Sequence, residues 1–402
     1  MADGRSNLRA RVFAPFALAC CVTSILCGCS DEPTAANALV AALPLTTIAV
    51  HDTTIVGNGS SSFRQYVTTN GIVNLVGARG SYIAKSALTF YPSDFPNRDT
   101  ALVYSATLTL RFVTRIGDST QPFAFNVYLI TRGWTEESLT WDTLQAGFYD
   151  PTILRGSYRG LAGSDSQYVS IPLDTAMVRQ WLATPTSTTN TKFGIILVPA
   201  SGCSVVRGFW EFAYGDSSSY WPTLQIIAGS PSGSPLDTAI YNQGIDAWGG
   251  NIDNLATNPQ LLYIQSGVDY RSTLNFDVSF LPKGAVINAA TVFLQKDPLT
   301  SRLTKFTSDS TFSLATILSP SDRTNIDVEY VNIARQAGTV LTYAGDMRRP
   351  VQIWTRGGTN FGVNLRPNPT MDPVSLDLLT FFNEQAPPAL RPRLKITWSV
   401  TR

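Results

Sequence analysis

Apolar and polar residues alternate one by one along many short stretches of this chain. Between residues 394 and 399 the apolar side chains are Leu394, Ile396 and Trp398, and the stretch 108–112 alternates in the same way. A period of two residues places apolar side chains on one face of a β-strand and polar ones on the other. Because turn residues separate many such stretches, we expect an all-β fold of antiparallel sandwiches.

Only one segment has a convincing helical period. Asp174 can cap its N-terminus, four apolar residues between 177 and 182 fall on one face, and Pro185 follows it. A weaker counterpart near 349–354 contains a proline. We therefore predict one short helix ending before Pro185, in a chain otherwise made of strands.

The two halves of the chain contain matching blocks in the same order. The matches are K-S-A-L-T-F at 85–90 with R-S-T-L-N-F at 271–276, S-A-T-L at 105–108 with A-A-T-V at 289–292, F-G-I-I-L-V-P at 193–199 with F-G-V-N-L-R-P at 361–367, and W-P-T-L-Q-I at 221–226 with R-P-R-L-K-I at 391–396. Four ordered matches are improbable by chance, so we interpret the halves as one duplicated domain.

A Gly-, Ser- and Pro-rich stretch lies between the repeats. Such residues support neither strand nor helix, so the sequence predicts an interdomain linker at 229–235. The first sandwich is expected at 47–228 and the second at 236–402, in tandem. A length of 402 residues agrees with two domains of ordinary size. We also expect the linker to be the preferred site of proteolysis.

The N-terminal segment is typical of a bacterial export signal. Three arginines precede an uncharged run at 12–26, which is too short for a comfortable membrane span. The run ends in L-C-G-C, which resembles a lipobox and implies a signal peptide at 1–28 and lipid attachment at Cys29. Residues 29–46 are then a tether. Because Ser30 follows the lipidated residue, the sorting rule implied by the resemblance favours the outer membrane.

The five cysteines agree with this interpretation. Cys27 is a competing lipid acceptor, but Gly28 directly before Cys29 favours the latter. Removal of the signal peptide leaves Cys203 as the only free thiol, so no disulfide can form within the mature chain. We expect Cys203 to be a small buried apolar residue.

The repeated blocks resemble the DNRLRE domain, which is also classed among carbohydrate-binding modules. The first half also contains the family's W-x-E-x-x-x-T-W motif as W-T-E-E-S-L-T-W at 134–141, whereas the second half has D-R-T-N-I-D-V-E-Y at 322–330 in its place. The resemblance covers most of 47–402. It implies two jelly-roll-type β-sandwiches in a bacterial surface or secreted protein.

The charge of the chain excludes two classes of partner. Charged residues are only 15% of the sequence and the formal net charge is +1. Nucleic acids and anionic membranes both require clustered Lys and Arg, so we expect neither as a partner. Contact with the membrane is expected through the lipid on Cys29 alone. Nothing in the sequence points to a particular oligomeric state.

The inventory of reactive side chains argues against an enzyme. His51 is the only histidine and lies at the edge of the tether, so a Ser-His-Asp triad would depend on this one residue and a His-rich zinc site cannot be built. Glu136 and Glu137 are adjacent, and on a strand they would point to opposite faces, which makes them poor partners in glycoside hydrolysis. We expect no catalytic residue, no metal and no cofactor. Acidic loop residues that could hold a structural calcium are Asp142, Asp150 and Asp253, but no D-x-D-x-D-G spacing supports such a site.

Two aromatic loops are the candidates for ligand binding, because ring faces stack on sugar CH groups while polar edges bind hydroxyls. The candidate residues are Trp210, Tyr214 and Tyr220 in one loop and Tyr241 and Trp248 in the other. Trp134 and Trp141 are expected in the core. The leading hypothesis is a non-catalytic surface lipoprotein that binds a polysaccharide or glycan. The alternative is a structural or adhesive envelope protein, and a polysaccharide-degrading enzyme is third.

Overall fold

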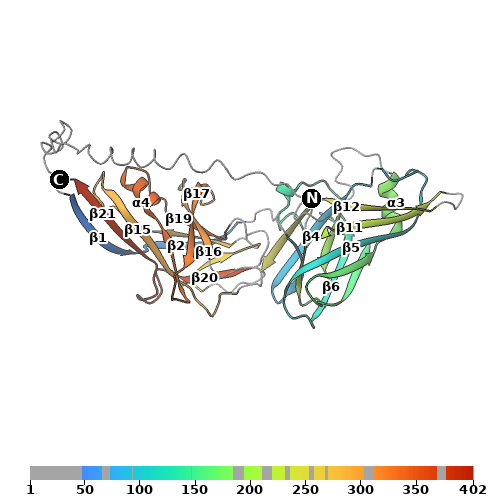
Figure 1. Cartoon of the computed structure of the whole chain (residues 1–402), viewed down its shortest axis with the longest axis horizontal. Helices are drawn as coiled ribbons and strands as arrows, with labels where there is room; N and C mark the ends of the chain where they lie inside the picture. Colours follow the sequence, from blue (N-terminus) through green and yellow to red (C-terminus); the bar gives the residue numbers. More distant parts are fainter. Residues whose placement is uncertain are drawn as a thin grey trace, which may run out of the picture. The chain divides into compact units, whose positions relative to one another are not determined.

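The computed structural model describes most of the chain beyond the predicted tether (Figure 1). The described residues are 48–65, 73–92, 94–145, 147–183, 194–210, 220–230, 236–252, 258–267, 270–302, 311–368 and 377–401. Among them, Val50–Val400 belongs to one compact unit. The predicted signal peptide, Cys29, the tether and Tyr214 lie outside the described residues. No helix in the described part is long and apolar enough to cross a membrane.

The expected all-β class is confirmed. Strands make up 56% of the structure and helices 7%, and every strand pair with a described register is antiparallel, in one of two sheets. The alternation predicted at 108–112 is present, because Leu108, Leu110 and Phe112 are buried while the residues between them are partly exposed.

The first sheet contains ten strands that follow one another in the chain. They are β3 (Val73–Arg79), β4 (Tyr82–Phe90), β5 (Leu102–Ile116), β6 (Pro122–Leu129), β7 (Gly156–Leu161), β8 (Gln167–Pro172), β9 (Gly194–Pro199), β10 (Val206–Trp210), β11 (Thr223–Gly229) and β12 (Leu236–Ile252). The order is β12-β11-β5-β10-β3-β4-β9-β6-β7, with β8 on β5. β12 also pairs with β4, so the path from β12 to β4 closes on itself around the first core.

The second sheet contains eleven strands from two separate parts of the chain. They are β1 (Ile48–Val56), β2 (Gly59–Arg64), β13 (Leu261–Gln265), β14 (Tyr270–Asn275), β15 (Val286–Gln295), β16 (Thr311–Ile317), β17 (Ile326–Arg335), β18 (Thr342–Asp346), β19 (Val363–Arg366), β20 (Leu378–Phe382) and β21 (Arg393–Thr401). The order is β1-β21-β15-β18-β17-β16-β19-β14-β13-β20, with β2 on β14.

The matched sequence blocks occupy matched registers in the two sheets. Leu224 of β11 lies opposite Leu108 of β5, and the corresponding Leu394 of β21 lies opposite Val292 of β15. The strand pairs β4–β9 and β14–β19 also correspond, residue by residue, through the blocks that begin at 85 and 271. The internal repeat seen in the sequence is therefore a repeat of strand pairing.

The segments in front of the two repeats are exchanged between the sheets. We call 48–64 and 236–252 the leading segments. The first of them pairs with β14 and β21 of the second repeat, and the other pairs with β4 and β11 of the first. Their places are equivalent, since Asp246 lies opposite Leu88 and Ser60 lies opposite Leu274, at matched positions of the repeat.

The exchange corrects the predicted boundaries. The sequence indicates sandwiches at 47–228 and 236–402, but the first sheet is made from 73–252 and the second from 48–64 together with 261–401. The predicted linker at 229–235 connects β11 to β12, which pair as neighbours from Gly229 and Leu236 onward. β11 and β12 are therefore neighbours in one sheet, and Gly, Ser and Pro are common between paired strands as well as in interdomain linkers. Composition alone cannot distinguish the two.

The predicted helix is confirmed as α3 (Thr175–Ala183), which buries four apolar residues against β5. Asp174 accepts a hydrogen bond from the Ala176 amide at its side chain, 2.9 Å, and forms an ion pair with Arg155. The counterpart is α4 (Arg348–Thr355), which packs on the equivalent strand β15. Pro350 lies in its first turn, where no intrahelical amide donor is needed.

Candidate functional site

Of the five aromatic residues that the sequence predicts as ligand contacts, the four that the structure describes do not form one exposed site. Trp248 is 0% exposed and packs in a core cluster with Val73 and Leu75, so its assignment to ligand binding is wrong. Tyr241 is partly buried against the first core, and Trp210 is partly buried at the end of β10. Tyr220 alone among the described four is classed as an exposed side chain, at 37%.

Trp248 is buried because its strand belongs to the first sheet. The register between β12 and β4 shifts between Gln243 and Asp246, and Trp248 in the second half of β12 lies opposite Ser86. The sequence around Trp248 has glycines where alternating polar residues would mark an outward face. The ring therefore points inward because β12 pairs with β4, and the local sequence pattern does not predict that pairing.

Tyr220 belongs to a group that the sequence did not bring together. The Arg111 guanidinium lies 3.7 Å from the centre of the Tyr220 ring and 5.5 Å from that of Tyr168. Arg111 faces Tyr168 directly across the β5–β8 pair, and Tyr220 precedes β11, on the other side of β5. We call these three residues the tyrosine–arginine ladder.

The ladder is held by cation–π contacts. The Nε and Nη1 atoms of Arg111 are buried and have no hydrogen-bond partner within the described residues, while both rings lie within cation–π distance of the guanidinium. Tyr168 is 54% exposed. Two rings that are exposed on one side and fixed by a cation on the other are rigid, which reduces the entropy lost when a ligand stacks on them.

Small polar residues continue the outer face of the first sheet beside the ladder. Across neighbouring strands Thr109 lies between Ser170 and Thr223, and Thr223 in turn lies opposite Asn242. The next row is formed by Pro172, Thr107, Gln225 and Ile240. Hydroxyl and amide groups beside exposed rings can hydrogen-bond to the hydroxyls of a molecule whose apolar face stacks on the rings.

The tryptophan motif lies in a loop rather than on a strand. Trp134 is buried, as expected, and its ring packs edge-on against Phe148, with 6.5 Å between the ring centres. Glu136 and Glu137 lie in a 3-10 turn, Glu136–Ser138, so the expectation that they alternate along a strand is wrong. Hydrogen bonds to its carboxylate from its own backbone amide and Thr135 lower the pKa of Glu137, which is the opposite of what a general acid requires.

Lys85, the basic residue that begins the first repeated block, is a buried cation. It is 8% exposed, and its Nζ donates to the Leu144 carbonyl at 2.9 Å. The ammonium also lies over the rings of Trp141, 5.0 Å from its centre, and Tyr149, 5.6 Å. Burial lowers the pKa of Lys85 to about 8. Trp141 is only partly buried and covers this charge, so the expectation that it lies in the core is wrong.

Lys85 should make the stability of the first sheet depend on pH. Its pKa is 10.5 in the unfolded chain and about 8 in the folded one, so between these values the unfolded chain binds an additional proton. Stability must then rise with pH across this interval, by up to about 3 kcal/mol. We expect Lys85→Met to be more stable near neutral pH and to lack this rise. Urea unfolding of both proteins at several pH values measures the difference between their free energies of unfolding. Titration of nearby tyrosines contributes equally to both proteins and cancels in this difference. An equal pH slope in both would contradict the assignment.

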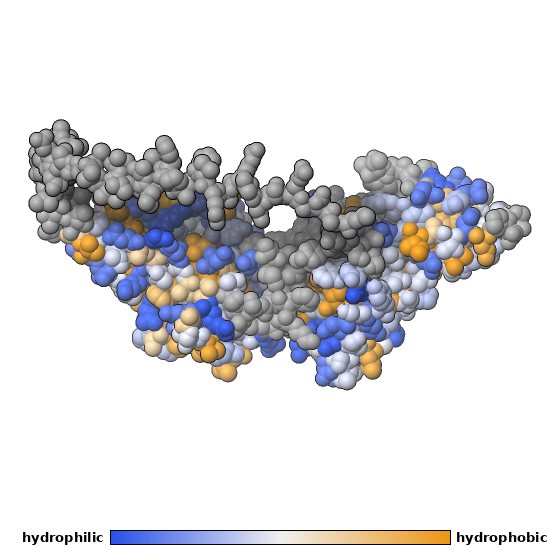
Figure 2. Space-filling model, in the orientation of Figure 1, coloured by the Kyte–Doolittle hydropathy of each residue, from blue (hydrophilic) through white to orange (hydrophobic). Residues whose placement is uncertain are grey.

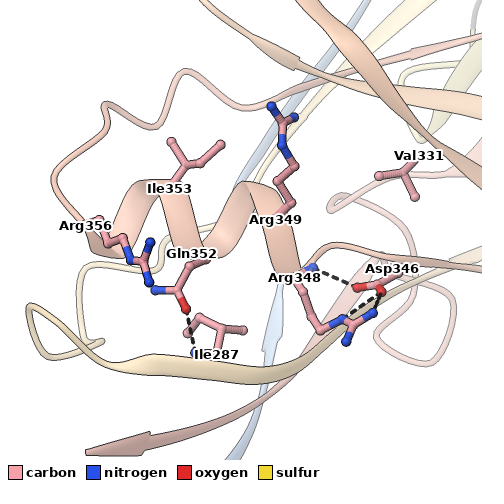
Figure 3. A pocket seen from close by; sticks show the side chains of 8 residues that line it. All are labelled: Ile287, Val331, Asp346, Arg348, Arg349, Gln352, Ile353 and Arg356. Atoms are coloured by element: carbon pink, nitrogen blue, oxygen red, sulfur yellow. Dashed lines mark hydrogen bonds and ion pairs between the residues drawn. The ribbon is translucent and has the colours of Figure 1, made fainter.

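The second sheet has a shallow hollow beside α4, with a volume of about 620 Å³ (Figure 3). Three arginines of α4 and its C-terminal cap line it, but two of them are already neutralised. Arg348 pairs with Asp346, and Arg349 pairs with Asp327 and Glu329. Gln352 is also engaged, since it accepts from the Ile287 amide at 2.9 Å. The hollow therefore offers little unbalanced charge to an anionic ligand.

The remaining candidates for chemistry have ordinary structural roles. His51 stacks on Trp398, with 5.2 Å between the ring centres. Cys203 packs against the first core but is only partly buried, and not fully buried as the sequence analysis expects. Asp150 accepts hydrogen bonds from the amide and hydroxyl of Thr152. The described residues contain no group of three or more His, Cys, Asp or Glu side chains arranged to hold a metal ion, and Asp253 lies outside them.

No protein-family model matches the chain. No curated protein matches it either. Among similar solved structures, the structure of the Macrobrachium rosenbergii nodavirus is 11% identical to this chain and aligns over 100% of this chain and 95% of that one, with a TM-score of 0.13. A TM-score of this size has no bearing on the fold.

Proposed function

We propose that this chain is a non-catalytic surface lipoprotein, anchored by a lipid on Cys29, which binds a polysaccharide or glycan. The observation that carries the proposal is the tyrosine–arginine ladder on the outer face of the first sheet. Its two exposed rings suit stacking on sugar CH groups, and the neighbouring Ser, Thr and Asn side chains suit the hydroxyls. The resemblance to the DNRLRE domain, with the jelly-roll sandwich it implies, supports the same function.

A structural or adhesive role is the alternative. Such a role would be expected to use a contiguous apolar patch for protein contact. On the face shown in Figure 2, apolar residues form small groups scattered among hydrophilic ones. The ladder, by contrast, presents rigid rings at one place, which favours glycan binding over a role as a spacer.

Removing one ring of the ladder should weaken glycan binding without unfolding the protein. We expect Tyr220→Ala and Tyr168→Ala each to cost about 1 to 3 kcal/mol of binding free energy, or roughly 5- to 150-fold in Kd. A glycan array probed with the lipid-free chain identifies the ligand, and calorimetric titration then measures the affinity of each variant.

Tyr330→Ala is the matched control, because Tyr330 is a similarly exposed tyrosine, at 47%, on β17 of the second sheet. It should leave the affinity unchanged. Equal weakening by the control, or unchanged affinity in both ladder variants, would contradict the role of the ladder. Release of reducing ends from the bound polysaccharide would instead favour the enzyme hypothesis.

A further inference from the structure

We infer that the second sheet has a separate binding pocket for a neutral, hydroxyl-bearing small molecule, of the class of a single sugar unit. The pocket has a volume of about 430 Å³, which is within the range of small-molecule sites. Asn58, Asn275 and Trp354 line it, together with Asp277 and Lys283. It deepens the proposed function by giving the second repeat a ligand of its own, and its test is independent of the ladder.

The C-terminal end of α4 forms one wall of the pocket. Gly357 adopts a left-handed conformation, with φ 102°, and its amide donates to the Trp354 carbonyl at 3.2 Å, while the Gly358 amide donates to the Ile353 carbonyl at 3.0 Å. This is the Schellman pattern, in which glycine ends a helix and reverses the chain. A Cβ on Gly358 would lie 2.9 Å from the Ile353 carbonyl oxygen. The glycines therefore fix the position of Trp354 in the last turn.

The first leading segment forms the opposite wall. Gly57 donates to the Pro392 carbonyl and Asn58 to the Asn275 carbonyl, both at 3.0 Å, at the connection between β1 and β2. These two bonds place Asn58 next to the end of β14. The pocket thus exists only because the first leading segment pairs with the second sheet.

Two of the residues that line this pocket have a buried polar side-chain atom without a partner in the described part of the chain. These atoms are the indole Nε1 of Trp354, whose side chain is 7% exposed, and the Oδ1 of Asn275. A buried donor and a buried acceptor without partners are each costly, by roughly 1 to 3 kcal/mol. By contrast, Asn360 is satisfied, since it donates to the Phe276 carbonyl at 2.8 Å and accepts from the Gly362 amide at 2.9 Å.

The chemistry of the lining favours an uncharged ligand with hydroxyl groups. An anion would meet Asp277 and the Asn275 oxygen, and a cation would meet Lys283 and the indole N–H. A hydroxyl both donates and accepts, so neighbouring hydroxyls can satisfy Asn275 and Trp354 together. Val278, Leu281 and Trp354, each only 7 or 8% exposed, supply the apolar surface on which a sugar ring can rest.

The first sheet fills the corresponding corner with its own side chain. The residue after Phe90 is Tyr91, whereas the residue after the matching Phe276 is Asp277. The Tyr91 ring lies against Gly244 in the other leading segment, so closely that a Cβ there would be 2.0 Å from a ring carbon. Asp277 is short, and its carboxylate accepts from the Ser279 amide at 2.9 Å. The two repeats therefore differ at the residue that occupies this corner.

The test uses the full lipid-free chain and a panel of free monosaccharides: glucose, galactose, mannose and N-acetylglucosamine. The readout is the NMR signal of the Trp354 indole proton, assigned with Trp354→Phe, which should shift on addition of at least one sugar. We expect Asn275→Leu to weaken the binding of that sugar roughly ten- to hundredfold. Asn332→Leu, at an exposed position of β17, is the matched control and should have no effect.

A second variant, in which a tyrosine side chain fills the pocket, keeps the test valid if Asn275→Leu fails to fold. We call it the plugged variant. The double substitution Asn58→Gly with Asp277→Tyr copies the first sheet, where this arrangement is already accommodated, and it should abolish binding. The inference is overturned if no sugar shifts the indole signal, or if the plugged variant still binds. Loss of monosaccharide binding in Tyr220→Ala but not in Asn275→Leu would also overturn it while leaving the ladder intact. The reverse pattern supports the pocket, and the ladder is then judged by the glycan titration of Tyr220→Ala and Tyr168→Ala alone.

Discussion

A fragment of residues 258–402 is expected to lack a cooperative thermal transition until a peptide of residues 48–64 is added. The peptide supplies β1 and β2, and β2 pairs with β14 along its whole length, from Gly59 to Arg64. Ile55 packs on the second core, and Leu274 covers Gly57. Without these strands, backbone N–H and C=O groups of β14 and β21 lose their partners and apolar side chains become exposed to water. The resulting loss of free energy is large compared with the marginal stability of a domain.

The fragment 73–252 should melt cooperatively by itself, since it contains all ten strands of the first sheet. Circular dichroism of both fragments, with a scrambled 48–64 peptide as control, measures the difference. The prediction fails if 234–402 folds without the peptide, because that fragment carries β12, which belongs to the first sheet, and lacks β1 and β2.

Trp248→Ala should lower the free energy of unfolding by about 3 to 5 kcal/mol, the cost of removing a large side chain from a packed core. Trp248 is completely buried and lies among Val73, Leu75 and Val206. Tyr220→Ala should change stability by less than about 1 kcal/mol, because its ring is exposed on one side. Chemical denaturation of 73–252 and of the full chain measures both variants.

The sequence assigns both aromatic residues to ligand binding, and of the two only Tyr220 should retain that role. If Trp248→Ala reduced glycan binding while leaving the denaturation midpoint unchanged, the burial of Trp248 in β12 would be contradicted. Trp134→Ala, at a core position that both the sequence and the structure indicate, is the positive control for a large loss of stability.

Local features of the sequence were interpreted correctly where their cause is local. The helix at 175–183 follows from a capping aspartate and an apolar stripe, which are properties of consecutive residues. Strand alternation depends on the two-residue period of the backbone, and it was also recognised correctly. Glu136 and Glu137 were misplaced because a 3-10 turn has no hydrophobic period by which to recognise it.

Only part of the candidate site could be predicted from the sequence. Tyr220 was identified from its loop, and the alternation around Leu110 already places Arg111 on the outer face. Tyr168 could not be joined to them, because its position opposite Arg111 depends on the register between β5 and β8. The pocket in the second sheet depends in the same way on residues 58, 275 and 354, which are far apart in the chain and meet only when β2 pairs with β14.

The sequence by itself determined the all-β class, the short helix and the order of the repeated blocks, because these arise from periodicity, capping and composition within short windows. The tertiary structure alone decided which sheet each leading segment joins. The backbone groups that pair strands are the same in every residue, and the two repeats offer equivalent strands, β4 and β14, to either segment. The choice between them is therefore made by packing across the whole chain, and it decides the burial of Trp248, the role of 229–235 and the presence of the pocket beside Trp354.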